Sequence, residues 1–401
     1  MKIRSEVKKA ILIGALCAIT YFSVYLCRDI LSTLGPELED GGIFSKSRLG
    51  TMSSVFFFTY AVGQLINGII GDRIKSKYMV SMGLILAAVC FFFIQFVTVS
   101  PMMPYVLYGG VGFFLAMVYA PMTKMIAENT EPMLATRCNV AHSLASYLGA
   151  PAAGLFAMWM TWRPALSASC MVMLAMGALF FLSVTIFEKK GMVRYGQYQP
   201  AKESGGSVKV LLRHQILRWT VIAMLTGIVR TAVLFWLPTY IPEYLHCNEE
   251  QSAVMYSVAT SVIAINSFLA VFIFERLRRN LELSILLFFS VAAVCFLGTY
   301  FIRQPIVNIS LMTLAMIFSN CASSIMWSRY CPSLRDTGMV SSATGFLDFC
   351  SYMAAAISSK LFAGAVSVIG WQNLILIWVS LMVCGMATGI PTKRKGAVQE
   401  I

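Results

Sequence analysis

Apolar residues along this chain occur in blocks of about 20, separated by short breaks that carry charged residues, Pro or Gly. A helix of this length crosses the hydrocarbon core of a bilayer, where each backbone group needs a partner within its own segment. The blocks do not show the alternation of barrel strands, so the pattern excludes a transmembrane barrel and predicts an all-α membrane protein. The twelve predicted transmembrane helices are Ile11–Leu34, Leu49–Ile70, Tyr78–Val97, Pro104–Ile126, Cys138–Met160, Pro164–Phe187, Trp219–Tyr240, Gln251–Phe274, Leu283–Ile302, Pro305–Ser328, Thr337–Leu361 and Trp371–Ile390.

One long polar interruption, Glu188–Arg218, carries Pro, Gly, Ser and many bases near the midpoint of the chain. We interpret residues 188–218 as a cytoplasmic linker between two six-helix bundles, residues 1–187 and 219–401. The basic start of the chain leads into an apolar run of about 24 residues with no small-residue cleavage site, which predicts a retained first helix rather than a signal peptide.

The composition agrees with a membrane protein. The chain is 58% hydrophobic and 12% charged, whereas a soluble domain carries about a quarter charged residues. Its 11 cysteines are scattered without a CxxC or Cys/His cluster, so we expect small hydrophobic residues and no metal site. The sequence contains no Ser/His/Asp grouping and no GxxxxGK[ST] motif, so we expect no catalytic residue, no cofactor and no ATP site.

The positive charges predict the orientation. With both termini in the cytoplasm, the cytoplasmic side holds 24 of the 31 Lys and Arg residues, if Lys124 at the inner end of the fourth span is included, and the outer segments hold only Lys46, Arg48, Arg163 and Arg303. The net charge of +13 then faces anionic lipid headgroups of the bilayer, so a nucleic-acid partner is not needed to explain it.

The two halves of the sequence resemble each other. Arg28 and Arg230 each lie eight residues before a proline, at an offset of 202 residues. The break after the second span reads Asp72–Arg73, and the break after the eighth reads Glu275–Arg276, at an offset of 203. This order and spacing predict a parallel duplication, which in transporters places the substrate between the two halves.

Arg28 and Arg230 are the main candidates for substrate binding. Each lies about 12 Å of helix below an outer-end proline, which places it near the middle of a ~30 Å hydrocarbon core. Two permanent positive charges across a cavity would repel each other unless an anion lay between them, and a guanidinium binds phosphate or carboxylate bidentately. The alternative is that each arginine forms a structural ion pair with an acid such as Asp29 or Asp348.

Four further residues within the spans could contribute. His142 could donate a hydrogen bond to an anion, or it could be a core histidine that a neighbouring helix satisfies. Asp348 could be a proton-coupling site or a partner that holds an arginine between turnovers. Gln64 and Tyr25 could donate hydrogen bonds into the cavity, although helix packing explains both equally simply.

The segment GIIGDRIKSK, Gly68–Lys77, places an acid and then bases in a tight cytoplasmic turn after the second span. Asp72 there can cap the N-terminus of a neighbouring helix, and the bases can pair with acids opposite. We therefore assign Asp72 and Arg73, with their counterparts Glu275 and Arg276, to a cytoplasmic gate. The turn resembles the GxxxDRxxxR motif of the major facilitator superfamily.

Several segments together resemble one branch of that superfamily, the organophosphate:phosphate antiporters: VYLCRD, YAVGQLINGIIGDR, NVAHSLASYLGAP, IVRTAVLFWLPTY and SSATGFLDFCSY. The resemblance implies two six-helix bundles in the cell inner membrane and an anion clamp made by Arg28 and Arg230, with help from His142. The family usually has lysine where this chain has Gln64, and a second base where it has Asp29. Both departures lower the positive charge of the cavity and leave room for a monoanion or a carboxylate.

These observations favour a secondary active transporter that exchanges a small organic anion, most simply a phosphate ester, for inorganic phosphate. A proton-coupled carboxylate symporter, with Asp348 or His142 as the titrating group, is one alternative. A non-transporting sugar-phosphate sensor of the same fold is another. We expect a monomer in the bilayer whose other partner is the small anion.

Overall fold

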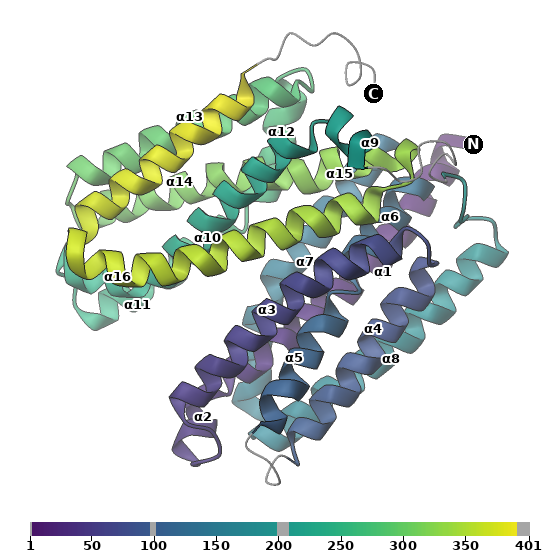
Figure 1. Ribbon diagram of the computed structural model, residues 1–401, viewed down its shortest axis with the longest axis horizontal. Coiled ribbons are helices and arrows are strands. Elements are labelled where there is room, and N and C mark those ends of the chain that lie inside the picture. The colour runs from purple at the N-terminus through teal and green to yellow at the C-terminus, as the bar shows by residue number, and fades with distance from the viewer. Residues whose placement is uncertain (1, 97–101, 199–207, 391–401) are drawn as a thin grey trace. The chain divides into compact units, whose positions relative to one another are not determined.

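The computed structural model describes residues 2–96, 102–198 and 208–390, and these residues form helices and no strands (Figure 1). The all-α class is therefore confirmed. Within these residues, nine helical stretches are long and apolar enough to cross a membrane, and a tenth is added if the bent pair Glu250–Ile263 and Asn266–Arg276 is one span. The two remaining predicted spans, Cys138–Met160 and Thr337–Leu361, also fall on helix.

The chain divides into two compact units. The first comprises Met1–Leu211 and Ser328–Phe349, and the second comprises Leu212–Trp327 and Cys350–Ile401. The division at Leu211 falls inside the segment interpreted as a linker, part of which, 199–207, lies outside the described residues. Residues 328–349 pack with the first unit although they belong to the predicted C-terminal bundle; the domain limits drawn from sequence stay a prediction.

The helices of the first unit are α1 (Lys2–Thr33), α2 (Gly35–Asp40), α3 (Lys46–Gly71), α4 (Ser76–Ile94), α5 (Met103–Leu115), α6 (Tyr119–Asn129), α7 (Pro132–Trp159) and α8 (Trp162–Lys189), followed late in the chain by α15 (Cys331–Ser333) and the 3₁₀-helix η2 (Leu334–Thr337). The 32-residue α1 is about 48 Å long, which is longer than the ~30 Å hydrocarbon core of a bilayer. The helix therefore begins well before Ile11, where the sequence pattern placed the first span.

The helices of the second unit are α10 (Ile216–Leu245), α11 (Glu249–Ile263), α12 (Asn266–Arg276), α13 (Leu281–Phe301) and α14 (Pro305–Ile325). Three elements cross a boundary between the units: α9 (Val208–Arg213), the π-helix η1 (Met326–Tyr330) and α16 (Val340–Gly389). The long α16 is two helices joined at Gly370, whose φ of 73° lies in the left-handed region that glycine adopts without strain.

Helix starts follow local sequence signals. Asn248 and Asn280 cap α11 and α13 by accepting hydrogen bonds from the backbone N–H groups three residues on, at 2.8 and 3.0 Å. Pro132 and Pro305 occupy the first helical positions of α7 and α14, where a missing N–H costs nothing.

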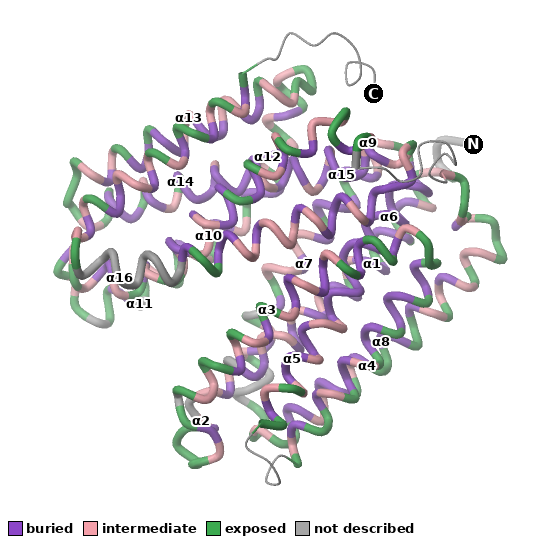
Figure 2. Tube along the Cα trace, in the orientation of Figure 1, coloured by how far each residue is buried: buried purple, intermediate pink, exposed green. Residues whose placement is uncertain are grey.

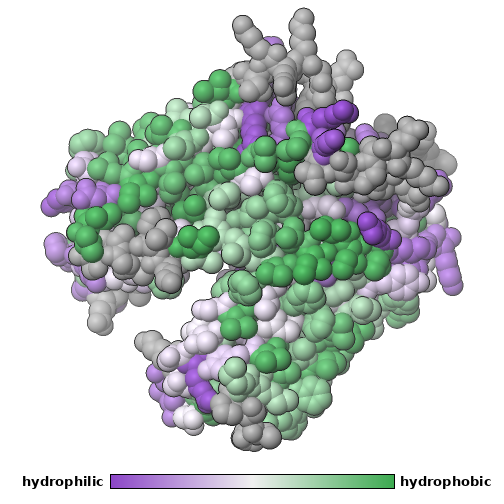
Figure 3. Space-filling view, viewed as in Figure 1, coloured by the Kyte–Doolittle hydropathy of each residue, from purple (hydrophilic) through white to green (hydrophobic). Residues whose placement is uncertain are grey.

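Small residues allow α1 and α7 to pack closely along their length. The Cys138 thiol donates to the carbonyl of Ala10 at 3.3 Å, and further along α7 the Cα of Gly149 lies against the backbone of Tyr25. Small residues at helix interfaces let backbones approach in this way. Figure 2 shows the buried residues along the inner sides of these helices, and Figure 3 shows hydrophobic residues over the visible helix sides, with hydrophilic residues gathered at helix ends.

The end of α8 and the residues after it are bonded to other parts of the first unit. Glu188 forms ion pairs with Lys75, at 2.7 Å, and with Lys77. The Asn129 side chain accepts a hydrogen bond from the backbone N–H of Arg194 at 2.7 Å. The hydrogen bond with Glu188 raises the pKa of Lys75 above its ordinary value. The start of the predicted linker is thus held against the turn between α3 and α4.

Candidate functional site

Arg28 lies on α1 among aromatic rings. Its guanidinium carbon is 4.9 Å from the ring centre of Tyr25, and 5.6, 5.1 and 5.3 Å from those of Phe56, Phe57 and Tyr60 on α3. Such cation–π contacts hold a guanidinium in place and do not neutralise its charge. The Arg28 side chain is 10% exposed, so its positive charge is fixed in a weakly screened place.

The rings of Tyr21 and Tyr25 link His142 to Arg28. The centre of the His142 imidazole lies 4.1 Å from the ring centre of Tyr21, which in turn lies 4.9 Å from that of Tyr25. The imidazole also lies 5.1 Å from the ring centre of Tyr119. His142 is buried, and neither ring nitrogen has a hydrogen-bond partner among the described residues. Because an unpaired buried polar group costs about 1–3 kcal/mol, this imidazole is suited to a polar ligand.

Gln64 and Asn139 share this property. Both side chains are buried, and the amide oxygen and nitrogen of each have no hydrogen-bond partner within the described part of the chain. Asn139 lies one turn before His142 on α7, so the two side chains share a helix face. Sequence reasoning missed Asn139, although its i, i+3 spacing from His142 in NVAHSLA was a usable signal.

The two remaining binding candidates, Asp348 and Arg230, lie on α16 and α10. Asp348, near the start of α16, lies within electrostatic reach of Tyr119, one of the two rings that contact His142. Arg230 lies partly buried on α10 of the second unit, which continues through Pro238 and Pro242. The convergence of Arg28 and Arg230 on one anion stays a prediction, as does their depth in the bilayer.

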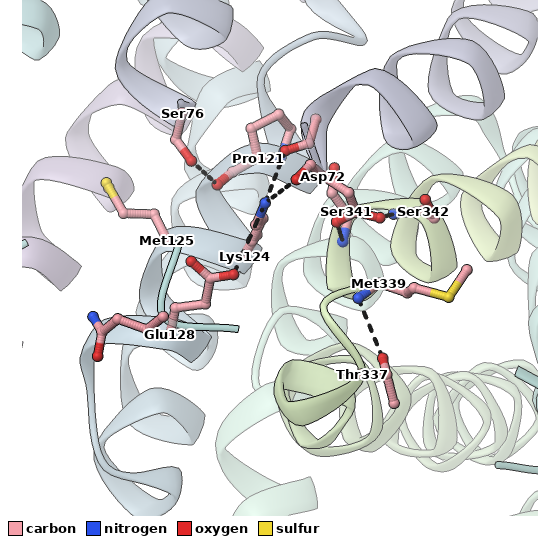
Figure 4. A network of polar contacts seen from close by, with 12 residues as sticks. Asp72, Ser76, Pro121, Lys124, Met125, Glu128, Thr337, Met339, Ser341 and Ser342 are labelled. Carbon is pink, nitrogen blue, oxygen red and sulfur yellow. Dashed lines mark hydrogen bonds and ion pairs between the residues drawn. The ribbon is translucent and has the colours of Figure 1, made fainter. Parts of the chain in front are cut away.

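Asp72 caps the N-terminus of α16, as Figure 4 shows. Its two carboxylate oxygens accept hydrogen bonds from the backbone N–H groups of Ser341 and Ser342, each at 2.9 Å. A helix N-terminus attracts negative charge, because its first N–H groups lack partners within the helix. Burial raises the pKa of the Asp72 carboxyl above its ordinary value, and the hydrogen bonds from Ser342 act in the opposite direction.

A buried pair that sequence reasoning missed supports the same turn. The Lys124 ammonium donates to the backbone carbonyls of Asp72, at 2.6 Å, and Gly71, at 3.3 Å, and lies 3.9 Å from the carboxylate of Glu128. The charge of Lys124 thus satisfies the last carbonyls of α3, while Asp72 satisfies the first amides of α16. Lys124 and Glu128 escaped notice because they fall at the end of the predicted span Pro104–Ile126 and its adjoining loop.

Glycines bring α3 and α16 into backbone contact beside this cap. A Cβ atom built on Gly345 would lie 2.8 Å from the Cα of Gly68 and would also meet the carbonyl oxygen of Gln64. A Cβ on Gly68 would lie 2.9 Å from the carbonyl oxygen of Ser341. Only glycine fits at this crossing, so Asp72 and the two glycines together hold residues 328–349 against α3.

The other end of this segment has its own anchors. Arg329 in η1 donates to the carbonyl of Pro132 and to the Thr136 hydroxyl on α7, both at 3.3 Å. Cys331 in the adjoining α15 is fully buried, where α15 packs on α6 and α7. A π-helix such as η1 is often found at functional sites, and here it lies where the chain passes from one unit to the other.

Of the remaining gate candidates, Arg73, Glu275 and Arg276 are exposed, and none forms an ion pair among the described residues. The bases of the turn that do pair with an acid are Lys75 and Lys77. A gating role for Arg73, Glu275 and Arg276 stays a prediction.

For the transport function that the sequence predicts, replacing Asp72 with alanine should slow uptake about tenfold, since removal of a charged helix cap costs about 1–2 kcal/mol and weakens the contact of residues 328–349 with α3. Initial rates of uptake into proteoliposomes measure the effect. The matched control is Asp336→Ala, because Asp336 lies in the same segment with an exposed side chain. Equal rates for the two variants would remove Asp72 from the gate.

A bundle of membrane-length helices with a buried cluster of polar side chains is typical of a membrane transporter. A sequence profile described as the Major Facilitator Superfamily matches residues 17–359. The chain belongs to this superfamily, which is a family of membrane transporters and not of enzymes, and it is a multi-pass membrane protein.

Relatives with known roles fall into three kinds. The phosphoglycerate transporter protein of Salmonella typhimurium is 21% identical over 401 residues, which cover 91% of this chain and 84% of the relative. The hexuronate transporter of Bacillus subtilis is 23% identical over 84% of this chain and 83% of its own length. The membrane sensor protein UhpC of Salmonella typhimurium is 32% identical over 69 residues, but the match spans only 17% of this chain and 16% of that protein.

The fold also matches solved structures. The crystal structure of FucP, a transporter of the same superfamily, superposes with a TM-score of 0.73 at 15% sequence identity, covering 96% of this chain and 100% of that one. At this identity the likeness concerns the fold alone.

Proposed function

We propose that the protein exchanges a small organic anion, most simply a phosphate ester, for inorganic phosphate across the cell inner membrane, with both termini in the cytoplasm. The observation that carries the proposal is the fixed charge of Arg28, which the rings of Tyr25 and Tyr21 link to His142, together with the buried side chains of His142, Asn139 and Gln64 that have no hydrogen-bond partner among the described residues. A guanidinium together with several hydrogen-bond donors can bind a phosphate group. The similarity to the phosphoglycerate transporter protein supports a substrate of this class.

In the proposed cycle, Arg230 completes the clamp from the second bundle, and the anion neutralises the repulsion between the two guanidinium groups. Residues 328–349 close the cytoplasmic side when Asp72 caps α16 and Gly68 meets Gly345. Release of these contacts opens that side, so the bound anion faces each compartment in turn.

Exchange predicts that uptake requires an anion inside the vesicle. In an empty carrier no anion neutralises the arginine charges, so reorientation costs ~3 kcal/mol more than with a bound anion. This cost slows the return of the empty carrier about a hundredfold. Counterflow in proteoliposomes loaded with inorganic phosphate, challenged with a panel of phosphate esters and carboxylates, measures the coupling and the substrate class together. Equal uptake into loaded and unloaded vesicles would contradict exchange.

Proton-coupled carboxylate symport is the second candidate, because Asp348 lies within electrostatic reach of Tyr119 and the hexuronate transporter matches most of the chain. In this case Asp348 neutralises an arginine in the empty carrier, and protonation of Asp348 releases the arginine for substrate. Accumulation into anion-free vesicles, driven by a pH gradient and lost in Asp348→Asn, would establish symport instead of exchange. A sensor would show neither activity.

A further inference from the structure

Arg218 lies at the start of α10, and one edge of its guanidinium has no partner among the described residues. The Nη1 atom donates to the Gln215 side chain at 3.2 Å and to the Glu282 carboxylate on α13 at 2.9 Å. The Nε and Nη2 atoms are buried, and neither forms a hydrogen bond within the described part of the chain. Burial of a donor without a partner costs free energy, and a charged donor costs more. This edge of Arg218 is therefore suited to a ligand.

The chemistry of the edge favours an oxyanion. The N–H groups of Nε and Nη2 point the same way in the planar guanidinium, so they can donate to two oxygens of one phosphate group. The side chains of Arg218 and Glu282 are 15% and 32% exposed, so the pair lies near the surface of the second unit. A ligand reaches the covered edge when neighbouring side chains change rotamer, as exposed side chains do within nanoseconds.

The backbone around Arg218 is strained. Among the described residues, four non-glycine residues have a positive φ, and three of them are Gln215, Arg278 and Arg279, at 59°, 52° and 61°. This left-handed region is costly for residues with a Cβ atom, and such residues cluster at ligand clamps and other functional sites. Arg278 and Arg279 follow one another directly before the cap of α13, where glycine would fit without strain. The chain thus keeps two arginines where glycine would be the easier residue.

Arg278 and Arg279 add positive charge beside Arg218. Both are exposed. Arg279 is three residues before Glu282, a stretch of chain that spans at most about 11 Å, and Glu282 contacts Arg218. An anion at the edge of Arg218 would therefore lie close enough to feel both exposed charges, because screening in physiological salt acts over about 8 Å.

We propose that these residues form a site for the phosphate group of an anionic phospholipid headgroup. The site, called the Arg218 cluster, comprises Gln215, Arg218, Arg278, Arg279 and Glu282. It follows the predicted cytoplasmic linker, so in the predicted orientation it faces the anionic leaflet, where basic pockets bind headgroups. A soluble phosphate offers the same oxygens, and the experiment below separates the two sources.

The Arg218 cluster is separate from the proposed anion clamp. All of its residues belong to the second unit. Arg230 lies twelve residues further along α10, which is about 18 Å of helix. The inference therefore does not depend on the proposed function.

Thermal unfolding of the full chain, purified in a neutral detergent, tests the inference, because a ligand that binds only the folded protein raises its Tm. The first arm adds phosphatidylglycerol, and its reference is phosphatidylcholine, which carries the same phosphate group in a neutral headgroup. The second arm adds sodium phosphate, and its reference is sodium chloride at equal ionic strength, since screening alone changes electrostatic stability.

Phosphatidylglycerol should raise the Tm of the native protein more than phosphatidylcholine does. Arg218→Lys should need about tenfold more phosphatidylglycerol for the same rise, because an ammonium keeps the charge but loses the fork. Arg278→Gln, which removes only an exposed charge, should need about fivefold more. The matched control Arg303→Gln removes an exposed arginine just beyond the other end of α13 and should respond as the native protein does.

The outcomes identify the ligand and can reject the site. A response to phosphatidylglycerol that weakens in Arg218→Lys supports a lipid headgroup. A response to sodium phosphate that weakens in Arg218→Lys but persists in Arg28→Lys supports soluble phosphate at the same cluster. Native responses of Arg218→Lys in both arms would overturn the proposal. If Arg218→Lys does not fold, an unchanged response in Arg278→Gln would overturn it instead.

Failure of this site and failure of the proposed function appear in different variants. Arg28→Lys should keep the native response to phosphatidylglycerol, whatever its transport rate. Loss of that response in Arg28→Lys, with a native response in Arg218→Lys, would place the lipid elsewhere and overturn the proposal.

Discussion

Replacing Arg28 with lysine should lower transport about a hundredfold while leaving the protein folded. An ammonium keeps the positive charge but loses the planar fork that binds an oxyanion bidentately, and a loss of about 2–3 kcal/mol of binding corresponds to this factor. The aromatic rings of Tyr25, Phe57 and Tyr60 still surround a cation at this position, so the fold keeps its cation–π contacts. Counterflow rates measure transport, and thermal unfolding of the purified variant measures folding.

Arg230→Lys should have the same effect, since the two arginines share one ligand in the proposed clamp. The control is Arg163→Lys. Arg163 also stacks on an aromatic ring, that of Trp162 at 4.9 Å, but it is exposed and lies outside the candidate site. Native rates in Arg28→Lys would reject the clamp. A structural ion pair predicts the reverse pattern, with a large loss of thermal stability.

The second large effect is expected from Gly345→Ala. The added methyl group would meet the carbonyl oxygen of Gln64 and the Cα of Gly68, and because both are backbone atoms of α3 they cannot rotate away. Overpacking of this kind costs about 1–3 kcal/mol, so the arrangement in which residues 328–349 close onto α3 becomes disfavoured by at least tenfold. Transport should fall accordingly, because the proposed cycle passes through that arrangement in each turnover.

Gly154→Ala is the matched control for this variant. Gly154 lies within α7, and a Cβ atom there would have no neighbour within 4 Å. Alanine favours helix over glycine by about 1 kcal/mol, so this variant should be at least as stable as the native protein and should transport normally. Equal transport by the two variants would show that the α3–α16 crossing is not part of the cycle.

Much of the fold could be predicted from hydropathy, because the bilayer forces apolar segments of sufficient length into helices. The internal breaks could not. The span Pro104–Ile126 is divided into α5 and α6 near Ala116, and Gln251–Phe274 is divided into α11 and α12 near Ala264. Both breaks lie within apolar sequence and arise from backbone turns of the i to i−3 type, which hydropathy does not register.

In the candidate site, too, some residues could be predicted from the sequence and others could not. The motif around Asp72 carried enough information to predict a helix cap, because the spacing of its glycines and charges is unusual. Lys124 and Glu128 gave no such signal, since a lysine and a glutamate near a predicted helix end are ordinary in sequence. Their importance comes from burial against the end of α3, a contact that only the tertiary structure shows.

The burial of Cys331 gives the protein a native chemical reporter. This thiol is sealed where α15 packs on α6 and α7, within the segment that the proposed cycle moves. A membrane-permeant maleimide would reach it only while that segment is detached, so the labelling rate would follow the fraction of time spent open to the cytoplasm. The difference in labelling between the native chain and Cys331→Ser would isolate this thiol from the other ten cysteines. The rate at which the protein opens to the cytoplasm could then be measured without an engineered probe.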